Sequence, residues 1–314
     1  NALGRGADPG VLQVGSKYLM VTTSGSAAGA LPARVSSDLV TWEDVGPVLP
    51  KAKWPAWVAG DYWVPEIHQV KDRWIAFFAA RSNLNGQPSV GVAWTKDLGR
   101  WANGELAWDA VEWKTSSTPL VTDDTQGMID PSFVSDGDRD YVFYKRDLWT
   151  NQPDGVWRHE SEIFGQELSI GDADITLAPD SARASILQIT LPWEGDVVEA
   201  PFLVKKDGYF HILYSANRYW EGKYVVSDAR SKSVLGPYEK LGKPILKSDE
   251  AWKGPGHGAL VTKLGRDWFV YHAYKAGEVG DAFPRQLMLD PVTWKDGWAT
   301  INDGTPSSGE RPAP

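Results

Sequence analysis

A repeat of about sixty residues is the feature that most constrains this chain. Five apolar runs each open on an aromatic residue just after a turn, with spacings of 56, 67, 68 and 59 residues, at Tyr18, Trp74, Tyr141, Tyr209 and Trp268. Short strand-like runs repeated at this period are typical of a β-propeller, which has about four strands per blade around a central channel. The sequence therefore predicts an all-β, five-bladed β-propeller.

A polar residue recurs in the shorter apolar run that precedes each aromatic. With the repeats aligned on the aromatics, these residues are Asp8, Glu66, Asp130, Glu199 and His257. If the shorter run is the innermost strand of each blade, all five begin that strand at the same end and several converge at the axis. The alternative is that acids before Pro or Gly only terminate turns, which is a common role for Asp.

The domain prediction follows from the extent of the repeat. Residues 1–301 are expected to form one propeller domain, and residues 302–314, rich in Gly, Pro, Ser and Thr, a linker or disordered tail. Within the propeller, residues 47–62 are expected to be an inserted loop between the first two blades. The tail would suit a connection to a further carbohydrate-binding module.

Composition excludes several classes of partner. The net charge is −9 without a basic cluster, which argues against a nucleic acid or an anionic membrane as partner. No run approaches the roughly 20 apolar residues that would span a bilayer. The chain has no Cys, so disulfides and thiolate chemistry are excluded. Its 17 Trp and 11 Tyr supply flat amphipathic faces of the kind that pack on sugar rings.

Three carboxylates in one channel suggest the chemistry. Hydrolysis of a glycosidic bond needs a protonated carboxylic acid at the leaving oxygen and a second carboxylate that activates water. A third acid can hold the pKa of the proton donor up by repulsion. Asp8, Asp130 and Glu199 satisfy this requirement. Carboxylates in a channel can also bind a hard cation such as Ca²⁺, and a non-catalytic glycan-binding propeller would show the same wealth of aromatics.

The sequence resembles glycoside hydrolase family 43 over nearly its whole length. The main matches are Asp8-Pro9, Ile129-Asp130-Pro131-Ser132 and the segment 193–201, which contains Glu199. Supporting matches are residues 61–66, 254–258, 285–294 and 296–298. Val64 and Gly258 depart from the residues that many members carry there.

The resemblance implies an inverting glycosidase in which Asp8 is the general base, Glu199 the general acid and Asp130 the residue that modulates the acid's pKa. Inversion requires about 6.5–9.5 Å between base and acid to admit a water. It also implies substrates among plant cell-wall polysaccharides and oligosaccharides containing arabinose or xylose, and from that substrate class an extracellular location. A Ca²⁺ ion is expected near His257 on the propeller axis, and no organic cofactor.

Substrate-binding residues are expected on loops at the mouth of the channel. Arg285 resembles a family Arg that reaches the sugar or the acids, with an outer salt bridge as the alternative, and the other candidates are the aromatics Trp54, Trp63, Trp149 and Tyr219. Four loops, containing residues 54–57, 148–152, 218–220 and 277–284, are expected to close the mouth into a pocket. A pocket favours an exo-acting α-L-arabinofuranosidase, and the alternatives are an endo-1,5-α-L-arabinanase or a β-xylosidase.

Overall fold

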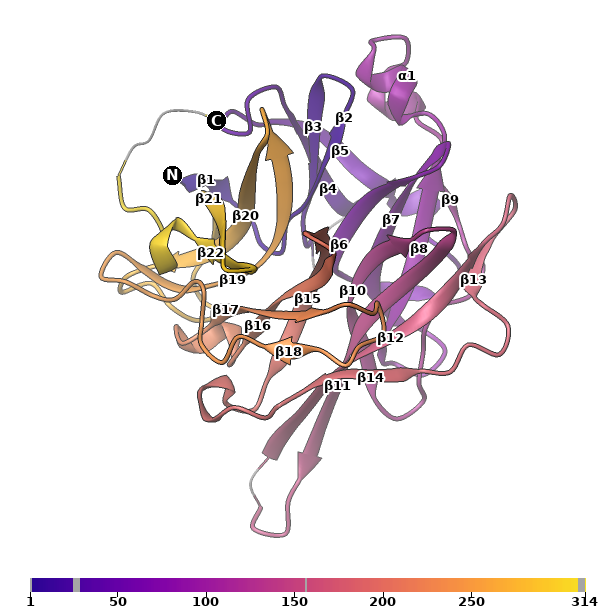
Figure 1. Cartoon of the computed structure of the whole chain (residues 1–314). Coiled ribbons are helices and arrows are strands. Elements are labelled where there is room, and N and C mark those ends of the chain that lie inside the picture. The colour runs from indigo at the N-terminus through magenta and orange to yellow at the C-terminus, as the bar shows by residue number, and fades with distance from the viewer. Residues whose placement is uncertain (1, 25–28, 156, 310–313) are drawn as a thin grey trace.

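The structure is a computed structural model that describes residues 2–24, 29–155, 157–309 and 314. Within these residues the strands form five antiparallel sheets around a common axis (Figure 1). The innermost strands β2, β6, β10, β15 and β19 contact one another in a closed ring. The predicted five-bladed β-propeller is confirmed.

In each blade, four consecutive strands form an antiparallel meander. The first has β2 (Gly10–Val14), β3 (Lys17–Val21), β4 (Gly29–Ser36) and β5 (Glu43–Pro50). The second has β6 (Val58–Val70), β7 (Arg73–Ser82), β8 (Pro88–Thr95) and β9 (Lys114–Thr115). The third has β10 (Gly127–Asp136), β11 (Arg139–Asn151), β12 (Trp157–Ile170), β13 (Ile175–Leu177) and β14 (Ala184–Gln188).

The last two blades complete the ring. The fourth has β15 (Val198–Lys206), β16 (Tyr209–Ala216), β17 (Val225–Ser231) and β18 (Glu239–Lys240). The fifth has β19 (Trp252–Lys263), β20 (Arg266–Lys275), β21 (Gln286–Lys295) and β22 (Trp298–Ile301), together with the N-terminal strand β1 (Ala2–Arg5), which pairs with β21. Sheet strands from both ends of the chain therefore share one blade.

Helices in the described residues are short connections. The one α-helix among them is α1 (Leu98–Ala102), and the 3₁₀ turns are η1 (Lys51–Lys53), η2 (Trp108–Ala110), η3 (Pro192–Glu194), η4 (Tyr219–Glu221) and η5 (Asn302–Gly304).

The hydrophobic core is divided among the interfaces between blades. Separate clusters of buried side chains join blades one and two, two and three, and three and four, and the largest joins blades four, five and one. Each of the five repeat aromatics lies within the first three residues of the second strand of its blade. Because a β-sheet blade presents side chains on both faces, every blade is stabilised by both of its neighbours.

A bulge with a left-handed residue recurs at the start of the innermost strands. The φ angles lie between 44° and 57° at Asp8, Val64, Asp130, Ala200 and His257. In β6, β10, β15 and β19 the pairing with the next strand slips at this point. Four of the five residues precede Pro, which cannot donate to the ladder and so favours a bulge.

The bulges correct the predicted register of the polar residues. Val64 and Ala200 occupy the positions equivalent to Asp8 and Asp130, whereas Glu199 lies one residue before its bulge and Glu66 two residues after. The alignment on the aromatics missed this offset because the bulges and the connecting turns differ between blades.

Two segments differ from the sequence expectation. Residues 47–50 continue β5 and β6 begins at Val58, so the connection between the first two blades is shorter than predicted. In the tail, the backbone N–H of Ser307 donates to Asp290 and the N–H of Lys247 donates to the carbonyl of Gly304. Residues 302–307 therefore pack on the fifth blade, while 310–313 of the predicted tail lie outside the described residues.

Candidate active site

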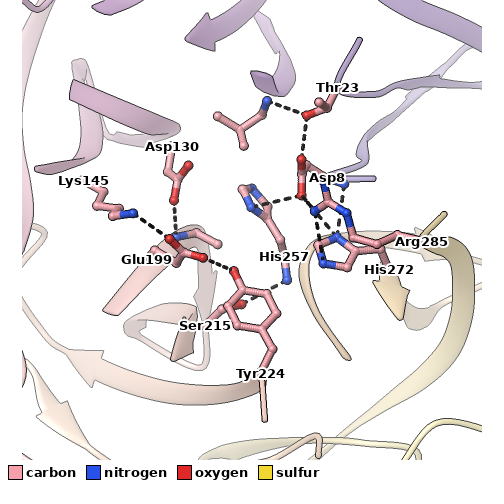
Figure 2. Close-up of polar contacts among 12 residues, drawn as sticks. Asp8, Thr23, Asp130, Lys145, Glu199, Ser215, Tyr224, His257, His272 and Arg285 are labelled. Atoms are coloured by element: carbon pink, nitrogen blue, oxygen red, sulfur yellow. Dashed lines mark hydrogen bonds and ion pairs between the residues drawn. The ribbon is translucent and has the colours of Figure 1, made fainter. Parts of the chain in front are cut away.

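A cavity of about 240 Å³ lies at the axis, where the bulged ends of the inner strands meet. It is lined by all three predicted acids, Asp8, Asp130 and Glu199. In Figure 2, Asp8 lies on one side of the site, Asp130 and Glu199 lie on the other, and His257 stands between them. Side chains from all five blades thus converge on one small volume.

Asp8 is surrounded by donors and positive charge. Its Oδ2 accepts from the hydroxyl of Thr23 at 2.6 Å, and its Oδ1 lies 2.9 Å from Nη1 of Arg285. The Nδ1 atoms of His272 and His257 lie 3.2 and 3.6 Å from Oδ1. Burial by itself raises the pKa of Asp8, but Arg285 and the two histidines outweigh it and hold the pKa well below its ordinary value. Asp8 is therefore an ionised carboxylate at neutral pH, as a proton acceptor must be.

Glu199 is held by two short hydrogen bonds. Lys145 Nζ donates to its Oε2 and the hydroxyl of Tyr224 donates to its Oε1, both at 2.6 Å. Burial raises the pKa of Glu199, but the ion pair with Lys145 and the bond from Tyr224 outweigh burial, so its pKa is lowered.

The pKa of Asp130 is shifted in the opposite direction to that of Glu199. It is 4% exposed, and its Oδ2 accepts from the backbone N–H of Ala200 at 2.8 Å. Burial raises the pKa of Asp130 to about 6, with a further contribution from the nearby charge of Glu199 and opposition from His257. Repulsion alone led to the expectation that Asp130 raises the pKa of Glu199. Lys145 acts against this repulsion by stabilising the ionised form of Glu199, so the pKa of Glu199 is lowered while that of Asp130 is raised.

The structure brings most of the predicted binding residues to the cavity. Trp63, Trp149, Tyr219, His257 and Arg285 all line it. The guanidinium of Arg285 also stacks on Tyr219, at 4.7 Å from the ring centroid. Arg285 is thus part of the site and not an outer salt bridge.

Trp54 is the exception. Its ring packs 4.9 Å from that of Tyr62, and its indole nitrogen donates to the carbonyl of Leu49. Trp57 of the same loop is 3% exposed in the core between the first two blades. This loop supports the blades and does not form a wall of the cavity, because its aromatics find apolar neighbours beneath them.

Glu66, the polar residue of the repeat in the second blade, lies outside the cavity. Its Oε2 accepts from the backbone N–H of Phe133 and lies 2.6 Å from Nε2 of His68. It therefore ties the second blade to the third.

Several cavity residues were not found by sequence reasoning, namely Thr23, Lys145, Asp147, His159 and Tyr224, whereas Arg218 and Trp220 belong to the predicted mouth loop 218–220. A signal existed for Lys145, because it follows directly on the apolar run 141–144 within the same predicted strand. A Lys that continues a buried strand needs a counter-ion, and here Glu199 is that counter-ion.

The predicted Ca²⁺ site has few protein ligands to draw on. The described residues contain no group of three or more His, Asp or Glu side chains arranged to hold a metal ion. The backbone N–H of His257 donates to Ser215, and its ring lies beside Asp8. These side chains do not form a protein cage, so an ion at His257 would have to be held largely by water. It stays a prediction.

The sequence model of the glycosyl hydrolases family 43 matches residues 2–299. The chain belongs to this family. Family membership, with three acids in one cavity, makes it a glycoside hydrolase. Among the described residues no helix is long and apolar enough to cross a membrane.

Individual relatives differ in the activity they are named for. The chain is 25% identical to an extracellular endo-α-(1→5)-L-arabinanase of Bacillus subtilis (strain 168), over 93% of this chain and 86% of that protein. It is also 25% identical to an extracellular exo-α-(1→5)-L-arabinofuranosidase of Cellvibrio japonicus (strain Ueda107), over 78% and 71%. Among solved structures, a thermostable family-43 glycoside hydrolase superposes with a TM-score of 0.82 at 28% identity, covering 99% of this chain and 96% of that one.

Proposed function

We propose that the protein is an inverting, exo-acting α-L-arabinofuranosidase that releases terminal arabinofuranosyl residues from arabinan or other arabinose-containing plant polysaccharides and oligosaccharides. The observation that carries the proposal is a small cavity that contains all three acids. At about 240 Å³ it lies below the roughly 300–1,000 Å³ usual for ligand pockets. A site of this size suits one terminal sugar and excludes a continuing chain.

In the proposed mechanism Asp8 is the general base. It takes a proton from a water molecule that attacks the anomeric carbon. Arg285 and His272 keep Asp8 ionised, and the bond from Thr23 fixes the orientation of its carboxylate.

Glu199 is the general acid, on the side of the cavity away from Asp8. The protonated fraction of Glu199, which the lowered pKa of this acid makes small at neutral pH, gives its proton to the leaving oxygen as the glycosidic bond breaks. Asp130 adjusts the pKa of Glu199 by its charge, and because the two acids interact electrostatically they titrate as a pair.

The walls of the cavity support binding of a sugar ring. Trp149 and Trp220 are stacked with ring centroids 6.4 Å apart, and Trp63 lines the same cavity. Aromatic faces pack on the apolar faces of sugars, while the charged groups accept and donate hydrogen bonds to hydroxyls. The named extracellular relatives support a location outside the cell.

One observation favours an endo-1,5-α-L-arabinanase as the second candidate. A further cavity of about 300 Å³ shares Thr23, Tyr219 and Arg285 with the first and extends over Asp281 and Phe283. Two adjoining cavities would accommodate a longer chain if they open into one groove. A β-xylosidase is the third candidate, supported by a Butyrivibrio fibrisolvens xylosidase/arabinosidase that is 27% identical over 95% of this chain and 54% of that protein.

Product analysis separates these candidates. Linear 1,5-α-arabinan and xylo-oligosaccharides are incubated with the protein, and early products are followed by chromatography. Arabinose alone from arabinan supports the proposal. An early ladder of arabino-oligosaccharides identifies the endo enzyme, and release of xylose without arabinose identifies the xylosidase. Proton NMR of the first product, recorded before mutarotation, shows whether the anomeric configuration inverts.

A further inference from the structure

A buried cation touches the proposed acid, and the mechanism above gives it no role. Lys145, on β11, has a side chain that is 5% exposed. Its Nζ lies 2.6 Å from Oε2 of Glu199 and 2.9 Å from Oδ1 of Asp147. One ammonium group is thus shared between two carboxylates. Figure 2 shows its contact with Glu199, the proposed proton donor.

Asp147 has a second partner at the same oxygen. Its Oδ1 contacts Nε2 of His159 on the neighbouring strand β12, and the ring of His159 stacks on Trp149 with centroids 4.6 Å apart. A continuous set of contacts therefore runs from Glu199 through Lys145, Asp147 and His159 to an aromatic wall of the cavity. Asp147 and His159 also line the cavity.

Burial of Lys145 is costly unless its charge is matched. A buried ammonium loses several kcal/mol of hydration, which good geometry with paired carboxylates offsets. Burial by itself lowers the pKa of Lys145, but Asp147 and Glu199 outweigh burial and raise it, so the side chain stays charged. A charge maintained in this way beside a titrating acid affects how readily that acid releases its proton.

We propose that Lys145 is a positioning residue for Glu199, which orients the acid's carboxylate and stabilises the anion that forms when the proton leaves, while Asp147 limits this effect by holding part of the lysine's charge. The inference rests on the proposed function. In the step concerned, the O–H proton of Glu199 passes to the leaving glycosidic oxygen as the bond to the anomeric carbon breaks. Glu199 is left as a carboxylate paired with Lys145, and it later regains a proton from water.

The groups around Glu199 act in opposite directions. Lys145 from β11, His257 from β19 and the hydroxyl of Tyr224 favour the ionised acid, whereas burial and the charge of Asp130 from β10 favour the protonated acid. Among the described residues, Asp147 contacts Lys145 and His159, and neither Asp147 nor His159 forms a hydrogen bond or ion pair with Glu199. A change at Lys145 or at Asp147 should therefore move the same titration in opposite directions.

The first variant removes the cation. Lys145→Met keeps a long apolar side chain, and loss of a positive charge next to Glu199 raises the pKa of the acid, by about 1 unit or more for a contact this close. The basic limb of the kcat/KM profile, which reports the acid, then moves to higher pH. The fall in kcat is larger for a substrate with a poor leaving group than for a nitrophenyl glycoside, whose departure needs little acid assistance.

The second variant tests the direction. Asp147→Asn removes the competing carboxylate, so Lys145 interacts with Glu199 alone and the basic limb moves to lower pH. Lys205→Met is the matched control, because Lys205 forms a similar ion pair with Asp136 at 2.8 Å but is half exposed and remote from the cavity. It should retain the wild-type profile and the wild-type ratio between the two substrates.

The inference is overturned if the basic limb stays in place in both Lys145→Met and Asp147→Asn and each variant loses equal activity on the two substrates. Lys145 would then have only a structural role. If Lys145→Met does not fold, the direction of the shift in Asp147→Asn decides. If the wild-type protein hydrolyses no arabinoside or xyloside, the proposed function fails, and NMR titration of the Glu199 carboxyl in wild type and Asp147→Asn still tests the inference. A lower pKa in Asp147→Asn supports it, and an unchanged pKa contradicts it.

Discussion

Arg285 and Asp8 are 277 positions apart in the chain, yet Nη1 of Arg285 lies 2.9 Å from Oδ1 of Asp8. The contact follows from the closure of the ring. Arg5 of β1 pairs with Gln286 of β21, which places the segment leading to Asp8 beside the residue that follows Arg285. The strand pairing that joins the two ends of the propeller thus also sets the electrostatic environment of the proposed base.

Replacement of Arg285 by Met should move the acidic limb of the kcat/KM profile to higher pH. Arg285 lowers the pKa of Asp8, so its removal raises that pKa and leaves the base protonated over more of the acidic range. The basic limb should stay in place, because Arg285 has no contact with Glu199 in the structure's described residues. An acidic limb that does not move would show that Asp8 is not the group titrating there.

Asp8→Asn and Glu199→Gln should each lower kcat by at least ~10³-fold, since general acid and general base catalysis are typically worth 10²–10⁴-fold each. Initial rates on an aryl α-L-arabinofuranoside and on arabino-oligosaccharides provide the measurement. Glu199→Gln should lose less on the aryl substrate, because its leaving group departs without a proton. Glu239→Gln, at an exposed position on β18, is the control. Near-normal activity of Asp8→Asn would refute its assignment as the base.

Asp130→Asn should move the limb that reports the acid to lower pH, with a severe loss of activity at neutral pH. The negative charge of Asp130 opposes ionisation of Glu199, and the amide carries no such charge. This direction is opposite to that expected for Lys145→Met, so profiles of the two variants measured together separate the two effects. A shift of both limbs in the same direction would contradict this explanation.

The stability of the fold should fall on acidification through His272. Burial, aided by the charge of Arg285, lowers the pKa of His272 to about 4, against an ordinary value of 6.5. Between these values the unfolded chain binds a proton that the folded chain does not, so stability rises with pH and is lost as pH falls from 6.5 towards 4. The difference corresponds to about 3 kcal/mol. Denaturant unfolding at pH 7 and pH 4.5 should show a smaller loss for His272→Gln than for wild type, and equal losses would disprove the assignment.

Calcium near His257 is tested by removal. If a hydrated Ca²⁺ ion binds beside His257, as a hard cation can do with an oxygen-rich shell, metal analysis should find about one equivalent. Treatment with a chelator should then lower the melting temperature or the activity, and added Ca²⁺ should restore it. Metal-free protein with unchanged activity and melting temperature would contradict the prediction.

The sequence predicted the ring because each blade repeats its own local pattern. An aromatic after a turn opens the second strand at Tyr18 and again at Trp74, and this signal does not depend on the rest of the molecule. The same holds for the acids Asp8 and Asp130, since the Pro that follows each of them reports a break in strand pairing directly in the sequence.

What the sequence missed depends on contacts between blades. Lys145 contacts Glu199 only because the third and fourth blades lie side by side. Whether the pKa of Glu199 is raised or lowered depends on that contact. Trp54 was wrongly predicted to face the cavity for a related reason. The local sequence is the same whether a loop aromatic faces solvent or, as here, packs back on Tyr62. Side-chain direction in such loops is decided by the neighbouring strand and not by the residue.

The residues with left-handed backbone at the inner strands hold their side chains at fixed positions around the cavity, whatever the side chain is. Four of the five, Asp8, Val64, Asp130 and His257, line the cavity, and a neighbouring Pro or Gly, rather than the residue itself, accompanies each bend. At Gly258 an added Cβ would lie 2.2 Å from the carbonyl oxygen of Val270, so no larger residue fits there without a shift of the backbone. The Pro or Gly that accompanies the bend and the residue that lines the cavity are thus neighbours in the sequence. A new specificity can arise by exchange at a position such as Val64 while the blades beneath it keep their packing.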